Sequence, residues 1–296
     1  MSGVAQADEP IFGYIYTTDL LPQGKTEIEQ WATEREGRSQ GSFHLLQTRT
    51  ELSYGLSDNL QISGYANLAW ASVNHNTPSG ETAPPEVFAD YDADPDARFR
   101  QFRVESFSFE ALYRFLSPYT DPVGAALYLE PSIGPRTREL EARLILQKNF
   151  LDDRLIFAFN TTLGYEWRYL QGDPSADPAS DDFRDHWDKE TDVNFGLAGS
   201  YRFVSNWSAG LELQNEREWA DLNPFKSENR TNSAWYFGPT LHYANEHFFA
   251  TGTILKQLPW AQDYANSGAD SFTVHGITNA DDFENYRFRL KLGYYF

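Results

Sequence analysis

Charged side chains of both signs recur at alternate positions in many segments of this 296-residue sequence, and they are the first candidates for chemistry. If such side chains line a water-filled pore, they select solutes by the sign of their charge, as charged rings do in channels. If they pair with one another instead, they neutralise each other and fill the interior of the protein. The sequence leaves both interpretations open, and the mixture of signs leaves the selectivity undecided. The candidates are Glu27, Glu29, Arg49, Glu51, Glu110, Arg114, Glu130, Glu139, Glu141, Arg143, Glu166, Arg168, Arg202, Glu212, Glu216, Arg287, Arg289 and Lys291.

The stretch DYDADPD, from Asp90 to Asp96, places aspartates at alternate positions and resembles the start of an EF-hand loop. It departs from that motif twice, because Pro95 replaces the glycine and Gln101 replaces the bidentate glutamate. We therefore reject an EF-hand and expect a solvated acidic loop. An adventitious site for a divalent cation stays open as an alternative.

A second acidic stretch, between residues 177 and 188, also contains a histidine. Some outer-membrane proteases use a pair of aspartates opposite an Asp-His pair, and Asp181, Asp182, Asp185 and His186 match these residue types. All four lie within one loop, whereas such a site converges from different strands across a cleft. The stretch therefore gives only weak support to a hydrolase of this kind.

The remaining motifs favour a protein without catalytic machinery. His242 and His247 flank a short connection, and two imidazoles without a nearby carboxylate make a weak metal site. The sequence has no G-x-S-x-G, no H-E-x-x-H and no P-loop. We expect no catalytic residue, no metal and no cofactor, although a Ser/His pair assembled across strands stays open.

The composition excludes several classes of protein. Lys and Arg number 24 against 43 Asp and Glu, and the net charge of −19 argues against nucleic acid as a partner. The absence of cysteine excludes disulfides, thiolate nucleophiles and Cys-ligated zinc. Mean hydropathy is −0.58, and no run of about 18 or more apolar residues predicts a membrane-spanning helix. The lack of a long apolar run does not exclude a membrane-spanning barrel, because each strand needs only about 9–11 residues and only every second one faces lipid.

The elements that position the charged side chains are predicted to be strands, because apolar and polar residues alternate with a period of two. The ending YRFRLKLGYYF is the clearest case, with aromatic and aliphatic residues on one side and mainly cationic residues on the other. The expected strands lie at about 25–36, 42–56, 59–73, 101–116, 122–131, 137–149, 153–170, 190–204, 206–219, 232–244, 246–257 and 283–296.

The connections between these segments alternate in length. Those after the second, fourth, sixth, eighth and tenth segments are short, and those after the third, seventh, ninth and eleventh are long and polar. Outer-membrane barrels show this asymmetry, with an even strand number and both termini on the periplasmic side. We predict an all-β, antiparallel, up-and-down transmembrane β-barrel of about twelve strands, with short periplasmic turns and long external loops.

The alternating side chains indicate which face meets lipid. In 153–170, one set from Leu155 to Tyr169 is mainly apolar and ends in aromatics, whereas the set from Arg154 to Arg168 is mainly small or polar. Large apolar residues outside and polar residues inside are typical of a membrane barrel. A soluble lipocalin-like barrel or β-sandwich is the alternative, and it would bury the apolar set instead.

The final strand resembles the signal by which Gram-negative outer-membrane proteins are recognised for barrel assembly. The residues that carry this resemblance are Tyr286, Phe288, Leu290, Leu292, Tyr294 and Phe296. The segment from Phe12 to Trp31 is similar to the mature N-terminus of an uncharacterised family of such porin-like barrels. These resemblances imply the outer membrane, contact with its lipid and lipopolysaccharide, and handling by the barrel-assembly machinery.

The N-terminal residues are expected to lie outside the barrel. Ala5-Gln6-Ala7 reads as the end of a secretory signal peptide whose hydrophobic region is missing, with an ordinary flexible tail as the alternative. We assign 1–24 to a signal-peptide remnant and a periplasmic segment, and 25–296 to the barrel. Residues 12–18 are expected either to pair briefly as an extra strand or to lie in the periplasm, and the sequence leaves open whether residues 12–25 enter the lumen.

The expected function is a narrow porin-like channel for small solutes with a lumen of mixed charge. One alternative is a barrel plugged by its own salt bridges, acting in envelope structure or adhesion through its acidic external loops. A less favoured alternative is a hydrolase at the outer rim.

Overall fold

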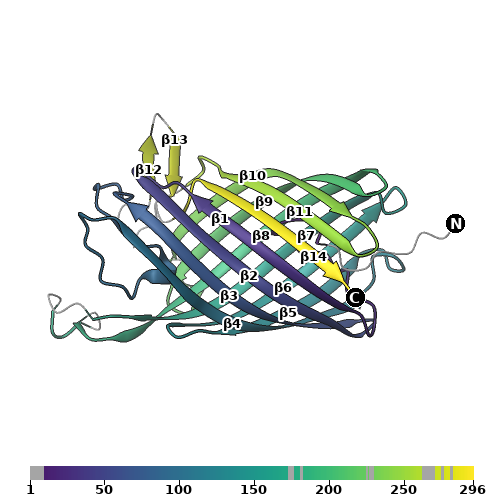
Figure 1. Cartoon of the computed structure of the whole chain (residues 1–296), viewed down its shortest axis with the longest axis horizontal. Helices are drawn as coiled ribbons and strands as arrows, with labels where there is room; N and C mark the ends of the chain where they lie inside the picture. The colour runs from purple at the N-terminus through teal and green to yellow at the C-terminus, as the bar shows by residue number, and fades with distance from the viewer. Residues whose placement is uncertain are drawn as a thin grey trace.

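A closed barrel of antiparallel strands forms the body of the protein (Figure 1). The computed structural model describes residues 10–172, 177–180, 183–224, 226, 230–261, 271–274, 277–280 and 283–296. Twelve strands pair with their sequence neighbours, and β1 closes the barrel against β14. They are β1 (Thr26–Glu36), β2 (Ser42–Ser57), β3 (Leu60–Asn74), β4 (Phe99–Leu116), β5 (Gly124–Ile133), β6 (Thr137–Phe150), β7 (Leu155–Leu170), β8 (His186–Val204), β9 (Trp207–Ala220), β10 (Arg230–Ala244), β11 (Phe248–Gln257) and β14 (Tyr286–Tyr295).

The predicted barrel is therefore confirmed, and the strands differ from expectation mainly at their ends. Strand β8 begins at His186, before the expected residue 190, because it continues its pairing with β7 beyond the apolar part of the sequence. Three short elements were not predicted, namely the 3-10 helix Glu86–Phe88 and the paired strands β12 (Ser271–Val274) and β13 (Ile277–Ala280). All three lie in polar connections without an extended alternating pattern.

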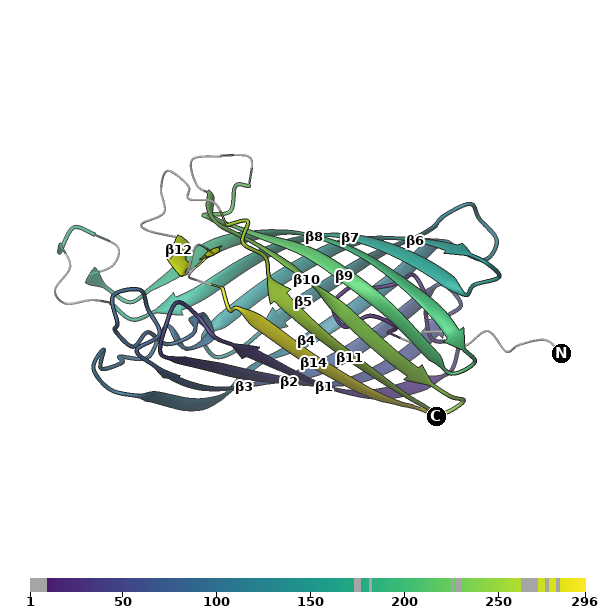
Figure 2. The ribbon, with the colours of Figure 1, turned by 90° about the horizontal axis from the view of Figure 1, so that it is seen from above.

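The loop lengths follow the predicted asymmetry. Figure 1 shows that β14 ends where β1 begins, at the end of the barrel that carries the short turns. Figure 2 shows the long connections gathered at the opposite end, among them the one that contains β12. In an outer-membrane barrel these are the periplasmic and external ends, respectively.

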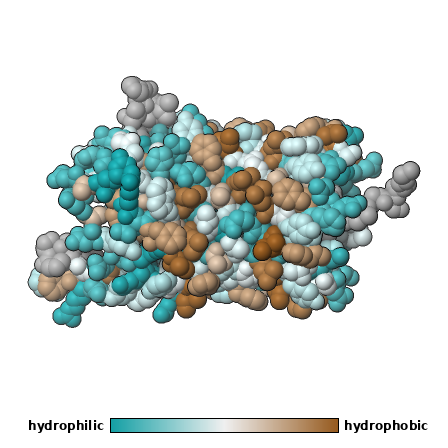
Figure 3. All heavy atoms as spheres, viewed as in Figure 1, coloured by the Kyte–Doolittle hydropathy of each residue, from teal (hydrophilic) through white to brown (hydrophobic). Residues whose placement is uncertain are grey.

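On the face shown in Figure 3, apolar residues gather over the middle of the barrel, between more hydrophilic ends. Leu129 and Leu197 are 47% and 51% exposed, and Phe109 on β4 is 52% exposed. The soluble alternative fails here, because a water-soluble barrel would bury this set of side chains. An apolar band on the outside is what lipid requires of a closed barrel. Within the described residues, no helix is long and apolar enough to cross a membrane.

The last strand shows the same two faces. Leu290, Tyr294 and the terminal Phe296 are exposed on the outward side, whereas Arg287 and Lys291 are buried on the inward side. The alternation read from the sequence thus separates a lipid-facing side from a lumen-facing side.

Candidate functional site

The barrel lumen gathers the charged side chains that the sequence singled out. Those that are buried on the inward side are Glu27, Glu29, Glu51, Glu110, Glu130, Glu212, Arg287 and Lys291. Those that are half-buried are Arg49, Arg114, Glu139, Glu141, Arg143, Glu166, Arg168, Glu216 and Arg289. Arg202 differs from the rest, because it is exposed near the end of β8 beside a short turn.

Several of these side chains pair with one another inside the lumen. Arg143 lies 2.8 Å from the carboxylate of Glu141, and Arg168 lies 3.0 Å from that of Glu166. The further pairs are Arg49 with Glu130, Arg168 with Glu86 and with Glu190, and Arg287 with Glu216 and with Glu284. Part of the lumen charge is therefore neutralised within the protein.

The last strand pairs with β1, and Lys291 lines the same small cavity as Glu29. Lys291 lies opposite Trp31 and Arg289 lies opposite Thr33, whereas Glu29 faces Gly293. The Lys291 ammonium is 3.7 Å from the centre of the Trp31 ring. A cation–π contact therefore joins the cross-strand neighbours Lys291 and Trp31.

Arg35 and Arg287 lie directly opposite each other on β1 and β14. Like charges in that position destabilise a sheet, and Glu284, just before β14, compensates both of them. Burial favours the protonated form of Glu284, but the two guanidinium groups outweigh it and lower its pKa to about 2. The carboxylate is therefore ionised at neutral pH and fixes the connection to β14 at the external end.

Residues 10–24 run into the lumen near the end with the short turns. The Glu212 carboxylate accepts hydrogen bonds from the backbone N–H groups of Gly13 and Tyr14, at 2.7 and 2.9 Å. The further acceptors of backbone N–H groups are Asn160 for Tyr16, Gln147 for Thr18, and Gln61 for Leu21. Side chains of four different strands thus take the place of a neighbouring strand's backbone.

Apolar side chains of this N-terminal segment fill hollows in the inward wall. Phe12 and Ile15 pack against Ala158 and Ala198. A Cβ atom at Gly196 would lie 2.1 Å from the end of the Ile15 side chain, so a larger residue there would force Ile15 to shift. These contacts correct our expectation that residues 12–18 form an extra strand or lie outside the barrel. The assignment of the first nine residues to a signal-peptide remnant falls outside the described residues.

The N-terminal segment bounds a central cavity of about 360 Å³ in the lumen. An outer cavity of about 220 Å³ shares Arg35, Gln47 and Glu105 with it. An inner cavity of about 40 Å³ shares Ile15 and Tyr16 of the N-terminal segment with it. The three cavities therefore follow one another along the lumen, and the smallest lies beside the segment.

The loop that contains DYDADPD folds back over the external mouth. Phe88 is buried against Phe43 and Phe99, inside the rim of the barrel. Asp90 accepts two hydrogen bonds from Arg103, at 2.7 and 2.9 Å. A solvated loop was expected, and the exposed Asp92, Asp94 and Asp96 agree with it. Asp90 does not, because it anchors the loop to β4.

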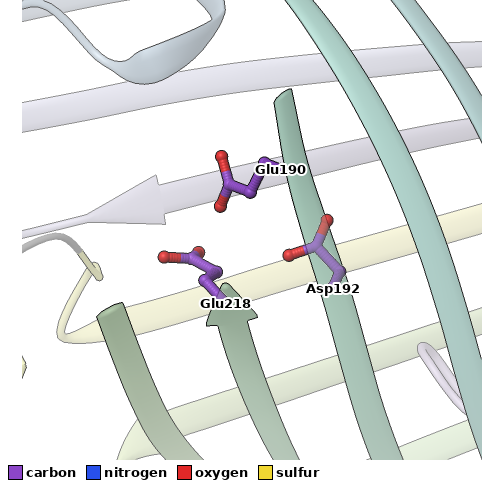
Figure 4. Close-up of side chains that lie close together, drawn as sticks. All are labelled: Glu190, Asp192 and Glu218. Atoms are coloured by element: carbon purple, nitrogen blue, oxygen red, sulfur yellow. The ribbon is translucent and has the colours of Figure 1, made fainter. Parts of the chain in front are cut away.

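Carboxylates also gather on the inward side of β8 and β9. Oxygen atoms of Glu190, Asp192 and Glu218 lie within 4.8 Å of one another (Figure 4). Oxygen ligands suit hard cations such as Ca²⁺, but Arg168 already pairs with Glu190 at 3.4 Å. The group forms an acidic wall of the lumen.

Among the described residues, the other candidates from the sequence have separate partners. Asp185 accepts hydrogen bonds from the Tyr169 hydroxyl and the Gly172 amide, and His186 contacts the Arg184 carbonyl oxygen. Asp181 and Asp182 lie outside the described residues. His242 is buried in the lumen and hydrogen-bonds with Thr251.

Sequence reasoning missed some lumen residues. Arg35 has an odd number, like the inward residues Glu27 and Glu29, so the alternation of inward and outward residues would have found it if extended to the end of β1. Glu105 was hidden by a β-bulge between β3 and β4. The inward residues of β4 have odd numbers up to Glu105 and even numbers from Ser106 onward.

The fold resembles solved outer-membrane channels. The COG4313 outer membrane channel from Pseudomonas putida F1 is 13% identical, with a TM-score of 0.56 and coverage of 94% of this chain and 97% of that chain. The NanC porin is 11% identical, with a TM-score of 0.50 and coverage of 90% and 98%, respectively. At these identities the likeness concerns the fold alone.

The closed barrel and its apolar outer face place the protein in the outer membrane of a Gram-negative cell. No curated protein matches the sequence. Residues 4–296 match a family of unknown function, DUF6662, and the chain therefore belongs to that family.

Proposed function

We propose that this barrel is a narrow channel for small polar solutes, with a lumen of mixed charge. The observation that carries the proposal is the run of three adjoining cavities from the external mouth to the N-terminal segment. Their walls are polar and charged, whereas the outside of the same strands is apolar. Water and solutes therefore have a favourable environment inside, in a barrel whose outside suits lipid.

In this proposal the N-terminal segment forms the constriction of the channel. It crosses the lumen and narrows the inner cavity to about 40 Å³. Its backbone is held by Glu212 and by carboxamide side chains, so the contacts that fix it can be weakened one at a time.

The same segment gives specific support to a second candidate, a sealed barrel with a structural or adhesive role. A segment that stays in place at all times would block passage, and the internal salt bridges would then serve stability alone. The exposed acidic side chains Asp92, Asp94 and Asp96 would in that case be available for contacts outside the cell.

We further propose that the barrel-assembly machinery recognises the outward side of β14. The apolar residues of this side end at the exposed Phe296, as the resemblance in the sequence requires. Lipid and lipopolysaccharide would then contact the same outward face after assembly.

Planar-bilayer recording of the refolded full-length protein separates the two candidates. A channel gives steady single-channel conductance, and Glu212→Ala raises it because the mutation removes the acceptor of two backbone N–H groups. Glu246→Ala, at an exposed short turn, is the matched control and should leave conductance unchanged. Inserted protein that stays silent in all three forms would refute the channel and favour the sealed barrel.

A further inference from the structure

Four residues that line the central cavity carry buried hydrogen-bond donors without a partner among the described residues. The donors are the Tyr14 hydroxyl, the Trp31 indole Nε1, the Arg35 Nε and the Arg143 Nε. Trp31 is 5% exposed, so its N–H group is held inside the lumen. Buried polar groups are normally satisfied, and a set made of donors requires acceptors from whatever enters the cavity.

Arg289 also lines the central cavity. Its guanidinium carbon lies 3.8 Å from the centre of the Tyr14 ring and 5.2 Å from that of Trp31. Its Nε donates to the Thr33 hydroxyl at 2.8 Å, and one terminal nitrogen donates to the Gly13 carbonyl oxygen at 3.1 Å. The other terminal nitrogen keeps its donors, since a guanidinium group carries five N–H bonds in a fixed fork.

Arg289 differs in its charge balance from the other arginines that line the central cavity. Arg35 pairs with Glu284, and Arg143 pairs with Glu141. Arg49 and Arg287 also pair with glutamates. Within the described part of the chain, Arg289 has neutral hydrogen-bond partners and aromatic neighbours but no carboxylate. Its positive charge therefore has no carboxylate partner of its own, although Glu105 and Glu139 line the same cavity.

We propose that the central cavity binds a small hydroxylated carboxylate, with its carboxylate on Arg289 and the neighbouring Tyr14 and Trp31 donors. An arginine that keeps free donors and is positioned by aromatic rings suits a planar carboxylate, because the two groups form parallel hydrogen bonds. The inference rests on the proposed channel for access to the cavity and adds the class of solute that the channel prefers.

The rest of the cavity wall suits a ligand with hydroxyl groups. Besides five glutamates and the arginines, it contains neutral hydrogen-bonding side chains: Gln47, Asn67, Ser106, Ser108, Ser132 and Asn160. Carboxamides both donate and accept, as a hydroxyl does, so each can satisfy a hydroxylated solute. The volume of about 360 Å³ lies in the range of small-molecule sites, roughly 300–1,000 Å³.

The test is block of the chloride current by gluconate, a hydroxylated monocarboxylate, with the neutral polyol sorbitol as the comparison. Gluconate should block the wild-type channel at lower concentration than sorbitol. Arg289→Gln should raise the blocking concentration of gluconate at least about tenfold, the loss expected for a charge-assisted hydrogen bond. Arg289→Lys should retain part of the affinity, because it keeps the charge and loses the fork.

Arg202→Gln is the matched control, because Arg202 is exposed beside a short turn and does not line the cavity. Conductance without gluconate is recorded for each variant, since Arg289 also holds Gly13 and its loss can release the N-terminal segment. Equal block by gluconate and sorbitol, or block insensitive to Arg289→Gln, would overturn the site and leave the channel intact.

Calorimetric titration of gluconate into the folded, detergent-solubilised barrel separates failure of the site from failure of the channel. A barrel without current that binds gluconate, and loses this binding in Arg289→Gln, would refute the channel and support the site. A barrel that releases no heat with gluconate overturns the site, whatever the current.

Discussion

Replacing Glu284 by glutamine should destabilise the barrel at neutral pH and remove part of its response to acid. The carboxylate lies between Arg35 and Arg287, which oppose each other on the strands that close the barrel. Glutamine keeps the size of the side chain but removes the charge. Two guanidinium groups would then face each other without their shared counter-charge.

The magnitude follows from the pKa of Glu284, which is lowered from an ordinary value of 4.5 to about 2. A difference of this size corresponds to about 3 kcal/mol of unfolding free energy, at about 1.4 kcal/mol for each pKa unit. Because the folded-state pKa is the lower one, this stabilisation is present above about pH 4.5. It is lost as the pH falls toward 2, where the carboxylate becomes protonated in the folded state as well.

The assay is urea unfolding of the refolded protein in detergent, followed by tryptophan fluorescence between pH 7 and pH 2.5. Wild-type protein should lose about 3 kcal/mol over this range from Glu284, and Glu284→Gln should start lower and respond less to acid. Glu246→Gln, at an exposed turn, controls for the general loss of a carboxylate. Equal stability of Glu284→Gln and wild type at pH 7 would show that this carboxylate does not hold the closing strands.

Three further substitutions test other parts of the structure. Burial raises the pKa of Asp19, and the hydrogen bonds from Tyr119 and Gln147 offset only part of this effect. Because the folded protein favours the protonated carboxyl, raising the pH should loosen the N-terminal segment. Asp19→Asn should remove that pH dependence, measured as the rate of proteolysis of the segment; an unchanged pH profile would contradict it. Asp90→Asn should expose the external loop to protease at neutral pH, because it weakens the bidentate pair with Arg103; equal cleavage rates would refute the anchoring role. Leu197→Arg, on the lipid side of β8, should cost up to about 4 kcal/mol in bilayer unfolding, whereas no loss relative to Leu197→Met would argue against lipid contact.

The barrel was predictable because its two faces meet different solvents. Residues such as Leu290 and Lys291 alternate so strictly that they determine which side chains point outward, and the short and long connections determine which ends lie together. Strand ends were less predictable, since β8 extends its pairing with β7 to His186, beyond the alternating apolar pattern.

The interior was predictable in composition but not in its contacts. Parity showed that Arg289 points into the lumen, whereas its contacts with Tyr14 and Gly13 depend on where the N-terminal segment lies. That segment has no neighbouring strand and no alternating pattern to reveal it. Its backbone is bound by side chains such as Glu212 and Gln147, which come from strands distant in the sequence.

Site-directed thiol labelling tests most directly whether ions cross the membrane through the central cavity. The sequence contains no cysteine, so Ser108→Cys places a single thiol in the cavity wall, and Phe109→Cys places one on the outward side of the same strand. A charged thiol-reactive reagent should change the single-channel current of Ser108→Cys and leave that of Phe109→Cys unchanged. A current that the reagent leaves unaltered in Ser108→Cys, or no current in either protein, would contradict conduction through the lumen.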